Sequence, residues 1–230
     1  MITNDTTDCS IFDFHLGETI LIDKPFKWTS FRVVHKIRKA VGVKKVGHAG
    51  TLDPMATGLL IVCTGKKTKE IVKYQDLEKT YTGTITLGKK TPSMDLETNI
   101  IEEKSLDNIT EEMILKAKEE FTGEILQIPP MYSAVKYKGK SLYKFARKGK
   151  TIKREPRKVF VSKFDIIKVN LPDIFFEISC SKGTYIRVIA NDLGIMLGCG
   201  AVLSSLRRTK IGNYKVENAL LINDFTKNFN

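Results

Sequence analysis

The 230-residue sequence lacks the patterns that mark exported, membrane-bound or metal-dependent proteins. Its four cysteines form no Cys-x-x-Cys pair and its three histidines show no metal-ligand spacing, which argues against a disulfide framework and against a zinc site. No apolar run approaches the length of a membrane span, and the polar N-terminus lacks the features of a signal peptide. We therefore expect a cytoplasmic protein with no metal and no membrane contact.

Several catalytic signatures are also missing. The sequence contains no Gly-x-Ser-x-Gly elbow, no phosphate-binding loop and no dinucleotide fingerprint. These absences disfavour serine hydrolases, nucleoside triphosphatases and NAD-dependent enzymes.

Acidic residues are outnumbered by basic ones, and the formal net charge is +12. The excess is concentrated in residues 131–158, which hold eleven Lys or Arg and a single acid, Glu155. Lysines and arginines neutralise phosphates, and interleaved aromatic rings stack on unpaired bases, so this composition favours RNA binding. The alternative is a solvated basic helix with a core-facing aromatic side. The aromatic residues concerned are Tyr132, Tyr137, Tyr143 and Phe145.

The order of expected elements predicts an α+β fold. Residues 1–18 contain four acids and no Lys or Arg, which indicates a loosely held acidic arm. From 19 to 230 we find no repeat and no linker, so we expect one domain. Strands and helices are mixed without a regular βαβ rhythm, which favours a central mixed, mostly antiparallel sheet flanked by helices. Strands are expected in 18–25, 58–65, 79–90, 158–170, 173–183 and 200–214, and helices in 29–42, 110–123, 184–197 and at the C-terminus.

Two of the expected helices carry clear end signals. Thr29 or Ser30 is placed to cap the first one and Gly42 to end it, with Phe31, Val34, Ile37 and Val41 expected on one apolar face. The helix in 110–123 has Thr110 as its cap and acids in its first turn.

The segment GHAGTLDPMATGLL, residues 47–60, places a lone carboxylate, Asp53, among three glycines and a proline. Pro54 disfavours helical geometry at Asp53, so the loop is either an ordinary Asp-Pro turn or a stiff mount for a reactive group. One carboxylate is too few for the usual glycosidase pair. It suffices for a nucleophile at an anomeric carbon or for stabilising oxocarbenium character there.

This segment and five others, in the same order along the chain, resemble the bacterial tRNA pseudouridine-55 synthase (TruB) family. The others are LIDKP with the following TS, KTYTGTITLG, IPPMYSAVKYKGKSLYKFARKG, CSKGTYIR and LRRTKIGNY, and the match runs from about Ile20 to Tyr214. The resemblance implies a pseudouridine synthase fold and conversion of a uridine in the tRNA T-loop to pseudouridine, without cofactor or metal. It identifies residues 129–158 as a thumb-like RNA-binding insertion.

The resemblance also implies the site residues. Asp53 falls on the catalytic aspartate, Tyr81 on the tyrosine that stacks on the target base, and Arg187 on the arginine that pairs with the carboxylate. His48 matches the histidine that packs against the T-loop once the uridine is flipped out. The remaining substrate-binding residues are expected to be Lys24, Tyr185, Leu206, Lys138, Lys140 and Lys144.

The sequence departs from the family pattern at two positions. Lys27 stands where the family usually has Gly, and Ala49 stands where Thr is more frequent. We expect no C-terminal PUA domain, no guide RNA, no obligate protein partner and a monomer. A non-catalytic tRNA-binding or tRNA-folding protein on the same scaffold is the alternative, and a guide-RNA-dependent subunit is a third, disfavoured reading.

Overall fold

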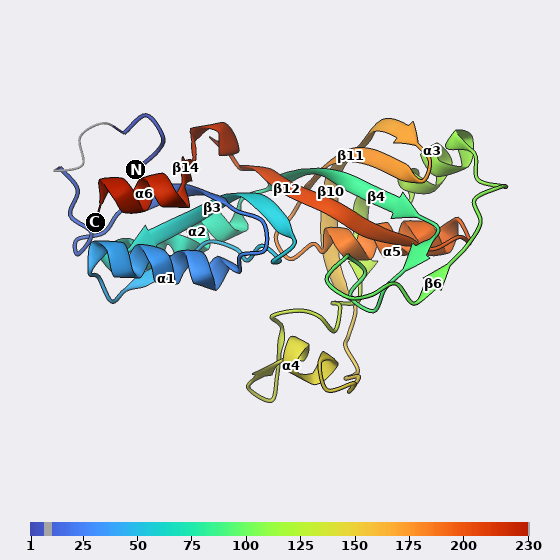
Figure 1. Ribbon diagram of the computed structural model, residues 1–230, viewed down its shortest axis with the longest axis horizontal. Coiled ribbons are helices and arrows are strands. Elements are labelled where there is room, and N and C mark those ends of the chain that lie inside the picture. The colour runs from blue at the N-terminus through green and yellow to red at the C-terminus, as the bar shows by residue number, and fades with distance from the viewer. Residues whose placement is uncertain (7–10, 230) are drawn as a thin grey trace. The chain divides into compact units, whose positions relative to one another are not determined.

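The computed structural model describes residues 1–6 and 11–229. The chain divides into unit 1, Met1–Thr82 with Leu206–Asn230, and unit 2, Gly83–Ser205. Strands β4 (Lys79–Leu87) and β12 (Ala201–Ile211) each have residues in both units. Helices and strands are mixed in each unit, as Figure 1 shows, and the predicted α+β class is confirmed.

Unit 1 is built on a mixed sheet. Its strands follow the order β14-β1-β3-β12, in which β1 runs antiparallel to β3, whereas β14 is parallel to β1 and β12 is parallel to β3. The short β2 and β13 add antiparallel pairs to β3 and β12. Besides parts of β4 and β12, the elements are β1 (Thr19–Lys24), α1 (Ser30–Val41), β2 (Val46–His48), β3 (Ala56–Thr64), η1 (Gly65–Glu70), α2 (Ile71–Asp76), β13 (Tyr214–Lys215), η2 (Val216–Asn218), β14 (Leu220–Leu221) and α6 (Ile222–Asn228).

Helix α1 begins and ends at the predicted signals, but one predicted core residue is wrong. The Thr29 side chain accepts a hydrogen bond from the Arg32 N–H at 3.0 Å, and Gly42 ends the helix in the left-handed region with φ +65°. The buried face is formed by Val33, Val34 and Ile37, whereas the Phe31 side chain is 66% exposed. The buried face of α1 is therefore centred on Val33, Val34 and Ile37, and Phe31 lies outside it.

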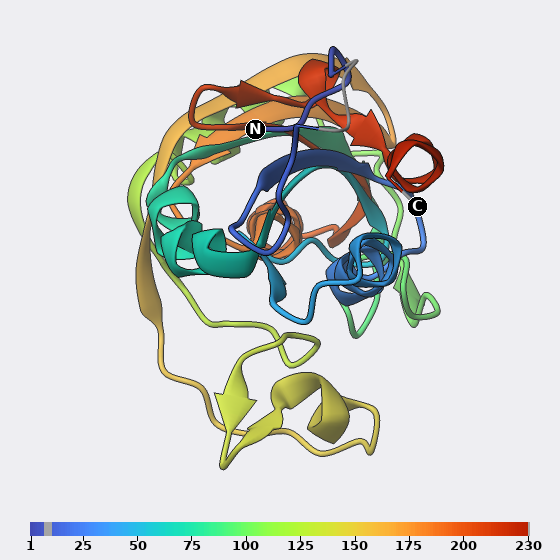
Figure 2. The same cartoon turned by 90° about the vertical axis from the view of Figure 1, so that its left-hand side faces the viewer.

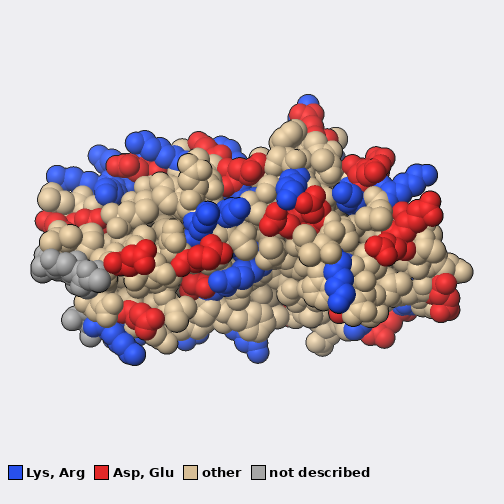
Figure 3. Space-filling model, turned by 90° about the horizontal axis from the view of Figure 1, so that it is seen from above, with Lys and Arg blue, Asp and Glu red and all other residues tan. Residues whose placement is uncertain are grey.

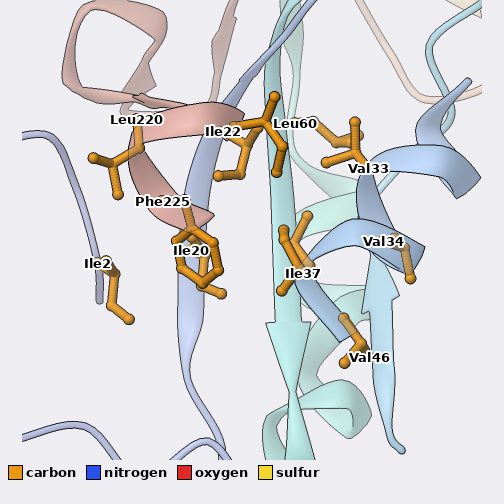
Figure 4. Close-up of a cluster of buried hydrophobic side chains, with 12 residues drawn as sticks. Ile2, Ile20, Ile22, Val33, Val34, Ile37, Val46, Leu60, Leu220 and Phe225 are labelled. Carbon is orange, nitrogen blue, oxygen red and sulfur yellow. The ribbon is translucent and has the colours of Figure 1, made fainter. Parts of the chain in front are cut away.

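One face of the unit 1 sheet packs on α1 and α6 through apolar side chains. Figure 4 shows Ile20 and Ile22 from β1 and Leu60 from β3 beside α1 residues and Phe225 of α6. Ile2 belongs to the same cluster, is fully buried, and donates its N–H to the Thr19 carbonyl at 2.8 Å. The expectation of a loosely held arm is therefore wrong for its first residues, whereas residues 7–10 lie outside the described part of the chain.

Unit 2 contains a long antiparallel ribbon and two substantial helices. The strand order continues as β12-β4-β11-β10-β7, with β10 antiparallel to both β11 and β7. Thr110 caps α3, as predicted, by accepting a hydrogen bond from the Met113 N–H. The elements are β5 (Lys89–Lys90), β6 (Glu102–Glu103), α3 (Glu111–Glu119), β7 (Gly123–Gln127), β8 (Lys136–Tyr137), β9 (Lys140–Ser141), α4 (Leu142–Ala146), β10 (Arg157–Asn170), β11 (Asp173–Cys180) and α5 (Ile186–Met196).

The basic segment between β7 and β10 forms a small projecting substructure of unit 2. It consists of the β8–β9 hairpin and α4, and both Figure 1 and Figure 2 show it extending away from the strands β7 and β10 that flank it. The charge is thus carried by a compact insertion and not by one long basic helix. Below, we call residues 129–156 the insertion.

Candidate active site

Asp53 lies on a loop that is fixed at both ends by strands of unit 1. β2 ends at His48 and β3 begins at Ala56, so seven residues form the loop. The side chain of Ser30, the first residue of α1, donates to the Leu52 carbonyl at 3.2 Å and accepts from the Leu52 N–H at 2.9 Å. The Lys27 N–H donates to the Pro54 carbonyl at 2.9 Å. The residues on both sides of the partly exposed Asp53 are therefore held by the β1–α1 segment.

Arg208 of β12 provides a further support for this loop. Its guanidinium is buried, with the residue only 1% exposed. Nε donates to the Leu59 carbonyl at 2.7 Å and Nη2 donates to the Gly50 carbonyl at 3.2 Å. One side chain thus links the Asp53 loop to the strand that follows it. The sequence analysis did not identify Arg208, since nothing in LRRT distinguishes its second arginine from a surface charge.

Glycine 58 allows β12 to run close to β3. Gly58 pairs with Arg208 in the parallel register and has φ +104°. A Cβ at this position would lie 2.3 Å from the Arg208 carbonyl oxygen and 2.7 Å from its nitrogen, closer than van der Waals contact permits. Glycine is therefore required here both by backbone angle and by space.

Lys24, at the end of β1, is completely buried beside the loop. Its ammonium donates to the carbonyls of Trp28 at 2.6 Å and Pro25 at 3.0 Å. Burial lowers the pKa of Lys24 to about 8, and the negative charge of Asp53 opposes that shift. Lys24 therefore holds the turn before α1 in place and contributes a positive charge near the carboxylate.

His48 ends β2 and precedes the loop. Burial lowers the pKa of its imidazole, and the charge of Arg208 adds to the shift, whereas a backbone contact with Gly50 opposes it. The imidazole is therefore neutral at pH 7. A neutral ring next to the loop suits packing against an RNA base better than it suits phosphate binding.

Tyr81 and Leu206 complete the predicted residues in unit 1. Tyr81 lies on β4 and is only 9% exposed, while Leu206 is partly buried and pairs with Ala56, the first residue of β3. Unit 1 thus contains Asp53, Lys24, His48, Tyr81 and Leu206, and its hydrogen bonds and strand pairs connect the Asp53 loop to β1, β3 and β12.

Arg187 lies in unit 2, at the start of α5, and is buried at 2% exposure. Its Nη1 lies 3.6 Å from the Asp95 carboxylate, and its Nη2 donates to the Tyr132 carbonyl at 2.6 Å. Tyr185 precedes it, with its ring centroid 5.8 Å from the guanidinium carbon. Because Asp53 and Arg187 belong to different units, the pair that the resemblance implies stays a prediction.

Sequence reasoning missed Asp95, the buried carboxylate that pairs with Arg187. Its backbone carbonyl accepts hydrogen bonds from the hydroxyls of Thr91 and Ser93, and its carboxylate accepts one from the Glu97 N–H. The hydroxyl residues that surround Asp95 in TPSMDLET were the available signal in the sequence. Asp95 therefore fixes the guanidinium of Arg187 from within unit 2.

The insertion presents its predicted RNA-binding lysines to solvent. Lys138, Lys140 and Lys144 are all exposed. Its aromatic rings mainly contact one another, since Tyr132 meets Tyr143 edge-on at 6.1 Å and Tyr137 meets Phe145 in the same way. Tyr137 is nevertheless 40% exposed, so the insertion presents both exposed lysines and an accessible aromatic ring.

The described part of the chain has neither a cluster of metal ligands nor a helix that could span a membrane. Within residues 1–6 and 11–229, no group of three His, Cys, Asp or Glu side chains is arranged to hold a metal ion. No helix in the same ranges is long and apolar enough to cross a bilayer.

Solved structures define the class of fold. The chain aligns with one from a crystal structure of a Cbf5–Nop10–Gar1 complex at a TM-score of 0.72 and 30% identity, covering 93% of this chain and 54% of that one. A structure of an H/ACA RNP bound to a substrate RNA containing 2′-deoxyuridine gives a TM-score of 0.69 at 27% identity, covering 93% and 53%. The chain spans about half of these two chains, and the fold is that of the pseudouridine synthases.

Sequence comparison then gives the family. Residues 38–186 match the N-terminal domain of TruB family pseudouridylate synthases, and residues 187–229 match the C-terminal domain of tRNA pseudouridylate synthase B. A tRNA pseudouridine synthase B from Flavobacterium johnsoniae is 49% identical, covering 91% of this chain and 94% of the relative. One from Chloroherpeton thalassium is 51% identical, with 90% and 88% covered. The chain belongs to the TruB family of pseudouridylate synthases, which are isomerases.

Proposed function

We propose that this enzyme converts uridine 55 in the T-loop of tRNA to pseudouridine. The observation that carries the proposal is the mounting of Asp53, a single carboxylate on a loop held by Ser30, Lys27 and Arg208 in a TruB family chain. The relatives at 49% and 51% identity are named tRNA pseudouridine synthase B, which supports tRNA as the substrate.

The reaction is an isomerisation in which atoms are rearranged within one nucleotide. The bond between N1 of uracil and C1′ of ribose breaks, and a bond between C5 and C1′ forms. The hydrogen on C5 leaves as a proton, and N1 gains one. A carboxylate at Asp53 can attack C1′, add to the base or assist formation of a glycal-like intermediate, and each route starts from the ionised side chain.

The residues around Asp53 have distinct tasks in this proposal. Tyr81 stacks on the flipped uracil and Leu206 provides an apolar wall, while neutral His48 occupies the space that the base leaves in the T-loop. Base flipping costs a few kcal/mol, which stacking and phosphate contacts offset. In unit 2, Arg187 is oriented by Asp95, and the roles that the family resemblance implies for Arg187 and Tyr185 are part of the same proposal.

The insertion supplies phosphate contacts to the T-arm through Lys138, Lys140 and Lys144. The chain is proposed to act as a monomer without a guide RNA or obligate protein partner, as the resemblance to the TruB family implies. Its domain plan is an acidic arm, 1–18, followed by a catalytic domain, 19–230. A cytoplasmic location follows from the tRNA substrate.

The experiment is tritium release from a tRNA transcript that carries 5-tritiated uridine. Wild type should release the label of one uridine per tRNA, and a transcript with cytidine at position 55 should give none. Asp53→Asn should release no label while still binding tRNA, because the amide cannot act as an anionic nucleophile or base. Asp165→Asn makes the same carboxylate-to-carboxamide change at a partly exposed acid of β10 and serves as the matched control with full release.

The outcome also separates the proposal from its alternative. A non-catalytic tRNA-binding protein would bind the transcript and release no tritium in its wild-type form. Full turnover by Asp53→Asn would contradict the assigned role of the carboxylate.

A further inference from the structure

The segment that holds the Asp53 loop has an unusual charge distribution. Between Asp23 and Asp53 the sequence contains eight Lys or Arg and no acidic residue. On the face of the molecule shown in Figure 3, by contrast, Lys and Arg side chains are interspersed with Asp and Glu. The excess positive charge in unit 1 is thus concentrated in one stretch, and that stretch is separate from the insertion.

Lys27 has a backbone conformation that its side chain disfavours. Its φ is +63°, in the left-handed region where glycine is the usual residue. Its N–H donates to the Pro54 carbonyl, one residue after Asp53, so the strained turn lies directly beside the catalytic loop. A strained backbone beside the catalytic loop points to a function for the Lys27 side chain, since a glycine would form the same turn without the strain.

The Lys27 side chain is exposed and has an aromatic neighbour. Its ammonium lies 5.7 Å from the centroid of the Phe26 ring, and Phe26 is 48% exposed. The insertion repeats this arrangement, because Lys138 has φ +47° and its ammonium lies 5.6 Å from the Tyr137 ring. The same pairing of an aromatic residue with a left-handed lysine therefore occurs once in each unit.

Helix α1 continues the positive surface from Lys27. Its buried face is Val33, Val34 and Ile37, and the opposite side exposes Phe31, Arg32, Lys36 and Lys39. The guanidinium carbon of Arg32 lies 3.9 Å from the Trp28 ring centroid, which holds the charge against the N-terminal end of the helix. Ser30 bonds this end to Leu52, next to the catalytic loop.

Among the described residues, no carboxylate neutralises these cations. Within the described residues, no carboxylate lies in ion-pair distance of Lys27, Arg32, Lys36 or Lys39, whereas elsewhere pairs such as Lys163 with Asp165 form at 2.7 Å. A surface with several unpaired cations and an exposed phenylalanine matches the chemistry of a nucleic-acid backbone with accessible bases.

We propose that Lys27, Phe31, Arg32, Lys36 and Lys39 form an RNA-binding surface, the α1 surface. It binds backbone phosphates of the tRNA strand that flanks the reacting nucleotide, with Lys27 contacting the phosphate closest to Asp53. This inference rests on the proposed function, and it adds a second phosphate-binding surface, in unit 1, to the insertion of unit 2.

The experiment measures tRNA affinity as a function of salt, in an Asp53→Asn background so that no turnover occurs. Filter binding to a tRNA transcript between 50 and 200 mM salt is compared for Arg32→Gln/Lys36→Gln/Lys39→Gln and for Lys215→Gln, an exposed lysine of β13. The triple variant should bind about 10-fold more weakly and lose about 2 units of the log–log salt slope, at roughly 0.7–0.9 per phosphate contact. Lys215→Gln should leave the slope unchanged.

Substitution of Lys27 gives a sharper test, because relief of the backbone strain should raise stability while loss of the ammonium should lower the affinity for tRNA. Lys27→Gly removes the strained conformation, so its thermal midpoint should equal or exceed that of the wild type. Its affinity for tRNA should nevertheless fall several-fold, and Lys27→Gln should fall by a similar factor. A purely structural lysine would give the reverse result, with a lower midpoint and unaltered binding.

The possible failures can be told apart. If the wild type releases no tritium, the proposed function fails. If it releases tritium while the triple variant and Lys27→Gly bind tRNA with the wild-type salt slope, the α1 surface is overturned and the proposed function stands. Neutralising Lys138, Lys140 and Lys144 should also lower the salt slope, and an unchanged slope there would contradict the phosphate contacts proposed for the insertion.

Discussion

Replacing Gly58 by alanine tests whether the close approach of β3 and β12 holds the Asp53 loop in place. The new Cβ would lie 2.3 Å and 2.7 Å from backbone atoms of Arg208, which cannot move aside as the end of a side chain can. A positive φ costs a residue with a Cβ about 1–2 kcal/mol, and overpacking of a buried strand costs about 1–3 kcal/mol. We expect Gly58→Ala to reduce the free energy of unfolding by about 3–4 kcal/mol.

Gly42→Ala is the matched control for this substitution. Gly42 also has a positive φ, +65°, but nothing lies within 4 Å of the position of its Cβ. Only the conformational part of the cost applies there, about 1–2 kcal/mol. The difference between the two variants therefore isolates the steric contact between β3 and β12.

The assay is urea unfolding of both variants and the wild type, analysed by linear extrapolation. A loss of 3–4 kcal/mol corresponds to a thermal midpoint lower by about 10 °C for a chain of this size. Folded Gly58→Ala should also release tritium more slowly, because the Arg208 side chain that supports Gly50 moves with its backbone. If Gly58→Ala is no less stable than Gly42→Ala, β3 and β12 can move apart without a free-energy cost, and their close approach does not hold the Asp53 loop rigidly.

Two further predictions concern the buried cations beside the loop. Arg208→Met should lower kcat about 10-fold or more, because the Asp53 loop is no longer held in place. The same substitution should raise the pKa of His48 toward 6.5, because the charge of Arg208 contributes to lowering that pKa. NMR titration of the imidazole measures the pKa, and a titration midpoint equal to that of the wild type would contradict the prediction. Because the pKa of Lys24 is about 8 in the folded chain, the unfolded chain binds more protons than the folded chain between pH 8 and 10.5. The free energy of unfolding of the wild type, relative to that of Lys24→Met, should therefore rise by up to about 3 kcal/mol across that interval. Equal urea midpoint differences at pH 8 and pH 10 would refute it.

The features that could be predicted from the sequence are those fixed by local chemistry. Thr29 and Gly42 bound α1 because capping depends on residues within one turn of the helix. The strand β1 ends before Pro25 for a similarly local reason. Asp53 was found because glycine and proline around a lone acid are visible in the sequence itself, and its role came only with the family resemblance.

The features that were missed depend on contacts between distant segments. Arg208 looks like a surface charge in the sequence, and only the pairing of β12 with β3 brings it to the Gly50 carbonyl, 158 positions away. The role of Asp95 depends on Arg187, which lies on α5, after six further strands along the chain. Phe31 was assigned to the core because i, i+3 spacing to Val34 fits, yet the core face of α1 is centred on Val33, Val34 and Ile37.

The departure from the family at position 49 can be explained by what surrounds it. Ala49 is fully buried in an apolar cluster with Leu21, Leu59 and Ile61, and its N–H donates to the Ile61 carbonyl at 2.9 Å. A threonine hydroxyl would need its own hydrogen-bond partner among these side chains, since an unpaired buried hydroxyl is destabilising. Alanine removes that need and leaves the backbone bond intact. The loop is therefore attached to the core by apolar contact at Ala49, and to its neighbours by hydrogen bonds at Gly50, Leu52 and Pro54, which leaves Asp53 as its partly exposed acid.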